Sequence, residues 1–163
     1  MNAAEIATIE VIESTLSEHG SYRKVDESLY VIKQGSTYVM INVVPWAEER
    51  ALVRCCAQLA RGVNMDGELA IDLLHLNSQL RFGAFAYEPN ERIVLFLHSI
   101  LGGATFDSDE LLATLTDVAI IADEYDDQII EIYGGQTMHD LLEDQALLNI
   151  LDTDPAEFSF SKA

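Results

Sequence analysis

The sequence predicts an α+β domain, in which an antiparallel sheet of about six strands has helices packed on it. Three observations predict this class. Apolar residues recur at helical spacing near the start, in the middle and in the last third of the chain. In the segments between them, apolar and polar residues alternate with the period of two that is typical of strands. Short turn-forming segments rather than linkers separate these elements, so the 163 residues are expected to form one domain.

A first helix is predicted over residues 3–18. Asn2 and Glu5 have the spacing of an N-terminal capping box, and Gly20 follows the last turn. The helix is expected to pack on the rest of the domain through one face. The apolar side chains of that face are Ile6, Ile9, Ile12 and Leu16.

Four strands are expected after this helix. The alternating pattern predicts them at residues 22–25, 29–34, 37–44 and 51–60. The fourth segment is also compatible with a helix, because Ala, Leu, Arg and Gln all favour that conformation. Its alternation of apolar and polar residues favours the strand.

A second helix and a hairpin follow. Helical spacing predicts the helix at residues 66–80, and a turn containing Pro89 separates strands at residues 81–87 and 92–100. The second of these strands is apolar on both faces. Such a strand is expected to be covered on both sides.

The clearest helix start lies at Asp107, which can act as the N-cap, with Glu110 completing a capping box. This long helix is expected to end at Tyr133, because two glycines follow it. A shorter helix after the glycines carries Leu141, Leu142, Leu147 and Leu148. We therefore place one domain at residues 1–151 and a polar tail at residues 152–163.

Composition and charge exclude several classes of protein. Hydrophobic residues make up 49% of the chain, enough for a core, which excludes intrinsic disorder. The net charge of −19 disfavours nucleic acid and anionic membranes as partners, because phosphate binding needs clustered Lys and Arg. The start of the chain does not resemble a secretory signal, and no apolar stretch is long enough to span a membrane. The adjacent Cys55 and Cys56 are poorly placed to form a disulfide with each other, so free thiols and a cytoplasmic protein are expected.

One acidic cluster is a candidate metal site. Asp123, Asp126 and Asp127 are three and four residues apart on one predicted helical face, where their carboxylates could hold a divalent cation. This is the alternative hypothesis of a metal-dependent enzyme or sensor. Like charges at this spacing are more often a solvated face, and the sequence contains no catalytic motif. We therefore expect neither an enzyme nor a cofactor.

The excess of apolar surface predicts contact with another protein. The helix at residues 66–80 carries a stripe of leucines that Ile71 and Leu74 widen, so its apolar arc is broader than one sheet contact needs. Together with the apolar strand at residues 92–100, this helix is the expected dimer or partner interface. Its candidate residues are Leu69, Leu73, Leu76, Leu80, Val94, Phe96 and His98. The alternative is that residues 141–151 cover this surface within the same chain.

The order of elements carries a resemblance to a known family, through residues 29–44, 51–80 and 92–123. Over most of the chain, this order resembles type III secretion chaperones, and within them the YbjN-like, Tir-chaperone-like bacterial proteins. The resemblance implies a homodimer built on the second helix and the late hairpin. It also implies a non-enzymatic role in binding or regulating other proteins, whose identity the sequence does not indicate.

Overall fold

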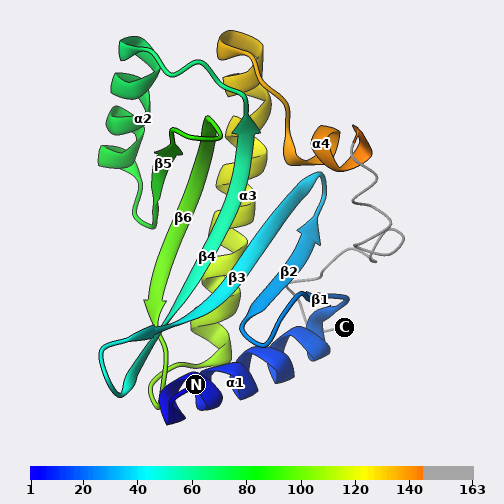
Figure 1. Cartoon of the computed structure of the whole chain (residues 1–163), viewed down its shortest axis with the longest axis vertical. Coiled ribbons are helices and arrows are strands. Elements are labelled where there is room, and N and C mark those ends of the chain that lie inside the picture. The colour runs from blue at the N-terminus through cyan, green and yellow to red at the C-terminus, as the bar shows by residue number, and fades with distance from the viewer. Residues whose placement is uncertain (145–163) are drawn as a thin grey trace.

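The structure is a computed structural model that describes residues 1–144 of the chain. Its elements are α1 (Ala3–His19), β1 (Arg23–Lys24), β2 (Leu29–Gln34), β3 (Thr37–Trp46), β4 (Arg50–Arg61), α2 (Gly67–Gln79), β5 (Ala84–Glu88), β6 (Ile93–Leu101), α3 (Ser108–Tyr133) and α4 (Met138–Asp144). The six strands form one antiparallel sheet in the order β1-β2-β3-β4-β6-β5 (Figure 1). The predicted α+β class and element order are confirmed. The predicted tail at residues 152–163 and the end of the predicted last helix lie outside the described residues.

The core lies between the sheet and the helices α1 and α3. Helix α3 crosses behind the sheet and packs against β3, β4 and β6, while α1 packs against the lower part of β3 and β4 (Figure 1). The odd-numbered residues of β4 from Ala51 to Leu59 are all buried beneath these helices, in one cluster with Ile12, Leu16 and Leu115. An antiparallel sheet of this kind needs only one covered face to be stable.

Local signals at the ends of the helices behave as the sequence predicts. The Asn2 side chain accepts a hydrogen bond from the Glu5 backbone N–H at 2.9 Å, and the Glu5 carboxylate accepts one from the Asn2 backbone N–H at 2.6 Å. Asp107 caps α3 and accepts from the Glu110 N–H at 2.9 Å, which is one of the two bonds of the predicted capping box. These bonds satisfy N–H groups that have no partner inside the helix.

The fourth predicted strand is a strand and not a helix, and the β3–β4 hairpin is longer than predicted. Pairing continues through the expected loop to Trp46 opposite Arg50, and Ala47 turns the chain with a φ of 57°. In this extension Pro45 pairs opposite Ala51, whose side chain is fully buried. Strand β4 therefore alternates between buried and more exposed residues from its first residue, Arg50, to Leu59.

The fifth strand begins three residues later than predicted, at Ala84. Gly83 has a φ of +62°, and its N–H donates to Nδ1 of His98 at 2.9 Å instead of entering the sheet. A Cβ at this position would lie 2.7 Å from the Leu97 carbonyl oxygen, so only glycine fits.

Helix α2 lies along the outer edge of β5 (Figure 1). The Asn77 amide accepts from the Phe85 N–H at 2.7 Å and donates to the Phe85 carbonyl at 3.2 Å. These are the outward-facing backbone groups of the edge strand, which would otherwise be available to another strand. The edge of the sheet is therefore closed by a side chain of the chain itself.

Candidate functional site

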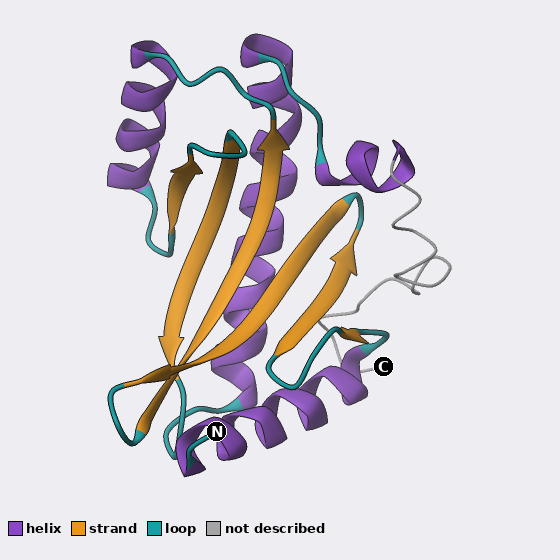
Figure 2. Cartoon of the chain, viewed as in Figure 1, coloured by secondary structure: helices purple, strands orange, loops and turns teal. Residues whose placement is uncertain are grey.

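The candidate site lies on the face of the sheet opposite α1 and α3. Within residues 1–144, no helix lies over its centre, as Figure 2 shows. The even-numbered residues of β3 and β4 and the odd-numbered residues of β6 point to this side and are half-buried or exposed from Met40 to Trp46 and from Leu52 to Gln58. We call this surface the open face.

The strand register arranges the middle of the open face in three rows that run across the sheet. In an antiparallel sheet, residues that are paired across strands stand side by side on the same face. The upper row consists of Val31, Met40, Cys56 and Leu97. The polar row consists of Asn42, Arg54 and Ser99, with Leu29 at its end. The lower row consists of Val44, Leu52 and Leu101.

Two of these rows are apolar although they face outward. A solvated face of an antiparallel sheet is usually polar, so half-exposed apolar rows indicate a surface suited to contact with another molecule. Cys56 shows how partial burial acts here, because desolvation raises the pKa of its thiol while nearby Arg54 opposes the increase. The thiol is thus neutral and behaves as an apolar side chain.

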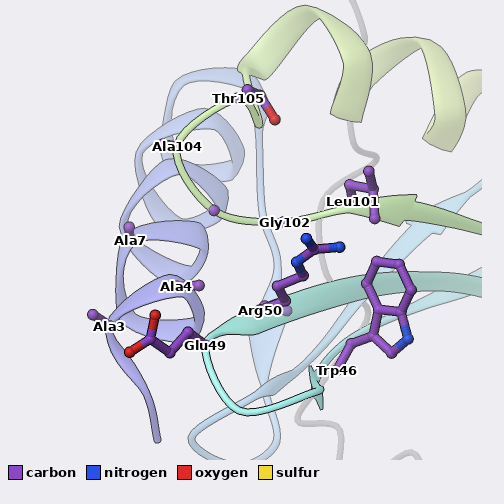
Figure 3. A pocket seen from close by; sticks show the side chains of 12 residues that line it. Ala3, Ala4, Ala7, Trp46, Glu49, Arg50, Leu101, Gly102, Ala104 and Thr105 are labelled. Carbon is purple, nitrogen blue, oxygen red and sulfur yellow. The ribbon is translucent and has the colours of Figure 1, made fainter.

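A groove of about 620 Å³ continues the lower row at the foot of the sheet. We call it the foot groove (Figure 3). Its walls come from the first turns of α1, the β3–β4 hairpin and the loop between β6 and α3. Trp46 and Leu101 line it and are 43% and 52% exposed, and the small side chains of Ala3, Ala4 and Ala7 line the opposite wall. The groove is therefore open, mostly apolar and wide enough for a side chain of a ligand.

Close backbone packing shapes the foot groove. The Gly102 N–H donates to the Ala51 carbonyl at 2.9 Å, and the Gly103 N–H donates to Oγ1 of Thr8 at 2.7 Å. A Cβ at Gly102 would lie 2.5 Å from that same Oγ1, so the loop approaches α1 only because it has no side chain there. The Arg50 guanidinium lies over the Trp46 ring, 5.5 Å from its centroid, and holds the indole at the mouth of the groove.

The predicted interface residues divide into two groups. Leu69, Leu73, Val94 and Phe96 are buried within a single chain, with exposed fractions of 6% or less. Helix α3 supplies their cover, because Tyr125 lies edge-on to Phe85 beside Phe96, and Ile129 shares a groove with Leu69 and Leu73. These four side chains were expected to lack cover within one chain, but the chain itself covers them.

The remaining predicted interface residues keep some exposed surface. Leu76 and Leu80 are half-buried against the core, and His98 is half-buried with its Nδ1 accepting from the Gly83 N–H. His98 also meets the Phe82 ring edge-on at 5.6 Å. These contacts give His98 a structural role in holding the start of β5.

The surplus apolar surface that the sequence predicts on the second helix is present at other positions. Ile71 and Leu74, on the outer side of α2, are 67% and 68% exposed. Leu74 lines a groove of about 260 Å³ between α2 and β5, and a separate groove of about 280 Å³ between α2 and α3 has the exposed Ile132 in its lining. Sequence spacing identified the width of the apolar arc, and only the fold shows which part of it faces outward.

The acidic cluster is not brought together into a metal site. Asp123 and Asp127 are exposed, whereas Asp126 is buried, and burial raises the pKa of its carboxyl to about 6. Asp123 accepts a long hydrogen bond of 3.4 Å from the Ser36 hydroxyl. Among residues 1–144, no three His, Cys, Asp or Glu side chains are arranged to hold a metal ion.

Sequence reasoning did not identify the open face or the foot groove. A signal for the open face was present, because Met40, Val44, Leu52 and Cys56 are apolar at the positions of their strands that alternate with the core positions. The foot groove left no such signal, because three segments distant in sequence form it. No helix within residues 1–144 is both long and apolar enough to cross a membrane.

The comparisons with known proteins agree with this architecture. The sequence model of a family described as T3SS (YopN, CesT) and YbjN peptide-binding chaperone 1 matches residues 7–141. This range extends from the second turn of α1 into α4 and includes the whole sheet. No curated protein matches the chain.

Proposed function

This chain belongs to the T3SS and YbjN peptide-binding chaperone family, and we propose that it binds an apolar segment of another protein on the open face and in the foot groove. The observation that carries this proposal is the pair of outward-facing apolar rows, which lead through Leu101 into the groove. Such a surface gains stability when a ligand covers it. The role is non-enzymatic, because recognition of a segment requires a surface and no reacting group.

The only tryptophan of the chain provides a direct test of peptide binding. Trp46 lines the foot groove and is 43% exposed, so a ligand that covers it transfers the indole from water to an apolar environment. Titration with leucine-rich synthetic peptides is expected to shift the Trp46 emission to shorter wavelength in a saturable manner. Absence of any saturable shift, together with unchanged anisotropy of a labelled peptide, contradicts the proposal.

A pair of substitutions distinguishes the open face from other apolar surface. Leu52→Glu places a carboxylate in the lower row and is expected to weaken peptide binding by about ten-fold, a change that corresponds to about 1.4 kcal/mol. Ile120→Glu is the matched control, since Ile120 is an exposed apolar residue on α3. Equal effects of the two substitutions would show that the ligand binds elsewhere.

We further propose that the protein is a homodimer that uses the outer side of α2. The exposed Ile71 and Leu74 support this proposal, because a second copy of the chain that covers them removes their apolar surface from water and so stabilises the dimer. Light scattering of the full chain is expected to give twice the monomer mass of 18.1 kDa. Leu74→Glu is expected to reduce it to the monomer value.

Leu74 is a sharper test position than the buried Leu73. A glutamate at Leu73 would enter the core of one chain and destabilise the fold itself, so loss of the dimer would have two causes. A particle of monomer mass for the unmodified chain at micromolar concentration contradicts the dimer.

We also propose a reducing, cytoplasmic location for the protein. Cys55 and Cys56, which are free thiols in the structure, support this proposal.

A further inference from the structure

Charge is segregated between the helices and the sheet. Helix α3 carries eight Asp and Glu residues and α1 carries four, and neither helix contains a lysine or an arginine. The open face has the opposite character, because none of the residues in its three rows is acidic and Arg54 lies in the middle of the polar row. In a chain with a net charge of −19, these three rows carry one positive charge and no negative charge.

Arg54 is exposed and its guanidinium has no ion pair or hydrogen bond with any described residue. Its neighbours in the polar row, Asn42 and Ser99, also have no side-chain hydrogen bond within residues 1–144. The polar row therefore presents donors of three kinds, a guanidinium, an amide and a hydroxyl, side by side and unused. An arginine fork with adjacent neutral donors is well suited to a carboxylate.

We propose that the open face binds a segment of a client protein that carries an acidic side chain between two apolar ones, with Arg54 as the partner of the carboxylate. This inference rests on the proposed function, since it specifies the chemistry of the peptide that the open face takes. The upper and lower rows receive the apolar side chains on either side of the acidic one.

The spacing of the rows limits how the ligand presents its side chains. Adjacent rows are two residues apart along each strand, which is about 6.5–7 Å. An extended ligand that runs along the strands presents alternate side chains at the same spacing, and a helix presents every fourth side chain at about 6 Å. The ligand is therefore expected to have the pattern apolar, acidic, apolar at alternate or at every fourth position.

Repulsion by the rest of the chain does not prevent this contact. Helix α3, which carries eight of the acidic residues, lies on the side of the sheet opposite the open face (Figure 1). Exposed charges farther apart than about 8–10 Å are largely screened at physiological ionic strength. Once the ligand lies on the sheet, the attraction between its carboxylate and Arg54 is therefore stronger than the repulsion from the acidic residues of α3.

Two series of fluorescein-labelled synthetic peptides test the inference by anisotropy with the full chain. One series has leucine, glutamate and leucine at alternate positions in a Gly/Ser background, and the other has them at every fourth position. Matched peptides carry glutamine or lysine in place of the glutamate. In at least one series, the glutamate peptide is expected to bind about ten-fold more tightly than the lysine peptide.

Substitution of the arginine adds the reciprocal measurement. Arg54→Glu is expected to weaken binding of the glutamate peptide about ten-fold and to strengthen binding of the lysine peptide. Arg81→Glu, at an exposed arginine in the loop before β5, makes the same change in net charge and is expected to alter either affinity less than about two-fold.

The outcomes separate this inference from the function on which it rests. If the glutamate, glutamine and lysine peptides bind equally and Arg54→Glu changes none of them, the acidic preference is refuted while peptide binding stands. If no peptide of either series binds, the proposed function fails and the inference fails with it. If Arg54→Glu alters the mass of the protein in solution, the open face is a contact between copies of this chain and the assignment to a client is overturned.

Discussion

Replacement of Asn77 by alanine tests whether a side chain, rather than a strand, closes the edge of the sheet. The Asn77 amide makes two hydrogen bonds with Phe85, accepting from its N–H at 2.7 Å and donating to its carbonyl at 3.2 Å. Asn77 is half-buried, so water replaces these bonds poorly when the amide is removed. Each bond contributes about 1 kcal/mol, and the substitution is expected to lower the free energy of unfolding by about 2 kcal/mol.

Urea unfolding followed by far-ultraviolet circular dichroism measures this loss, and thermal unfolding is expected to show a decrease in Tm of about 4–8 °C for a domain of this size. Ser78→Ala is the control, because the Ser78 hydroxyl is exposed and bonds only within its own helix, to the His75 carbonyl. The control is expected to change stability by less than about 0.5 kcal/mol.

Asn77→Asp separates the hydrogen bonds from simple packing. Aspartate has nearly the same size and still accepts from the Phe85 N–H, but its carboxylate repels the Phe85 carbonyl. It is therefore expected to be at least as destabilising as alanine at neutral pH. A loss below about 0.5 kcal/mol for both variants would refute the reasoning, because the amide would then contribute nothing that solvent does not supply.

Two further predictions follow from burial and close packing. Gly102→Ala is expected to lower the free energy of unfolding by about 1–3 kcal/mol, because its Cβ would lie 2.5 Å from Oγ1 of Thr8, whereas Gly67→Ala, with nothing within 4 Å, is expected to be neutral or slightly stabilising in the same urea assay. The pKa of Asp126 is raised to about 6 by burial, so the folded state holds a proton that the unfolded state has released, and stability decreases as the pH rises from about 4 to about 6. The free energy of unfolding of Asp126→Asn is then expected to exceed that of the unmodified chain by about 1 kcal/mol near pH 8, after allowance for screening by solvent. Near pH 4 the two free energies are expected to be equal. Asp127→Asn removes the same charge from an exposed position, and an equal pH dependence in that control would contradict the assignment to burial.

The fold class and the limits of most elements could be predicted from the sequence, because the signals are local. A capping box acts over three residues, and Asn2 with Glu5 forms one of the two that were predicted. Alternation over six residues placed β2 at its observed limits, Leu29–Gln34. The excess of apolar residues on the second helix is likewise present, at Ile71 and Leu74.

The candidate site depended on contacts that no local pattern contains. The Asn2 side chain reaches the Arg50 carbonyl across 48 residues, and Thr8 accepts from Gly103 across 95, and both bonds lie where the foot groove forms. Helix α3 covers Phe96 and leaves the opposite face of the same strand open, a choice that an apolar pattern on both faces cannot predict. The sequence by itself determined which residues would form helices and strands, since propensity and periodicity act between near neighbours. Only the tertiary structure decided which apolar side chains stay exposed and that Arg54 has no ion pair within residues 1–144, because burial and charge pairing depend on what the rest of the chain covers.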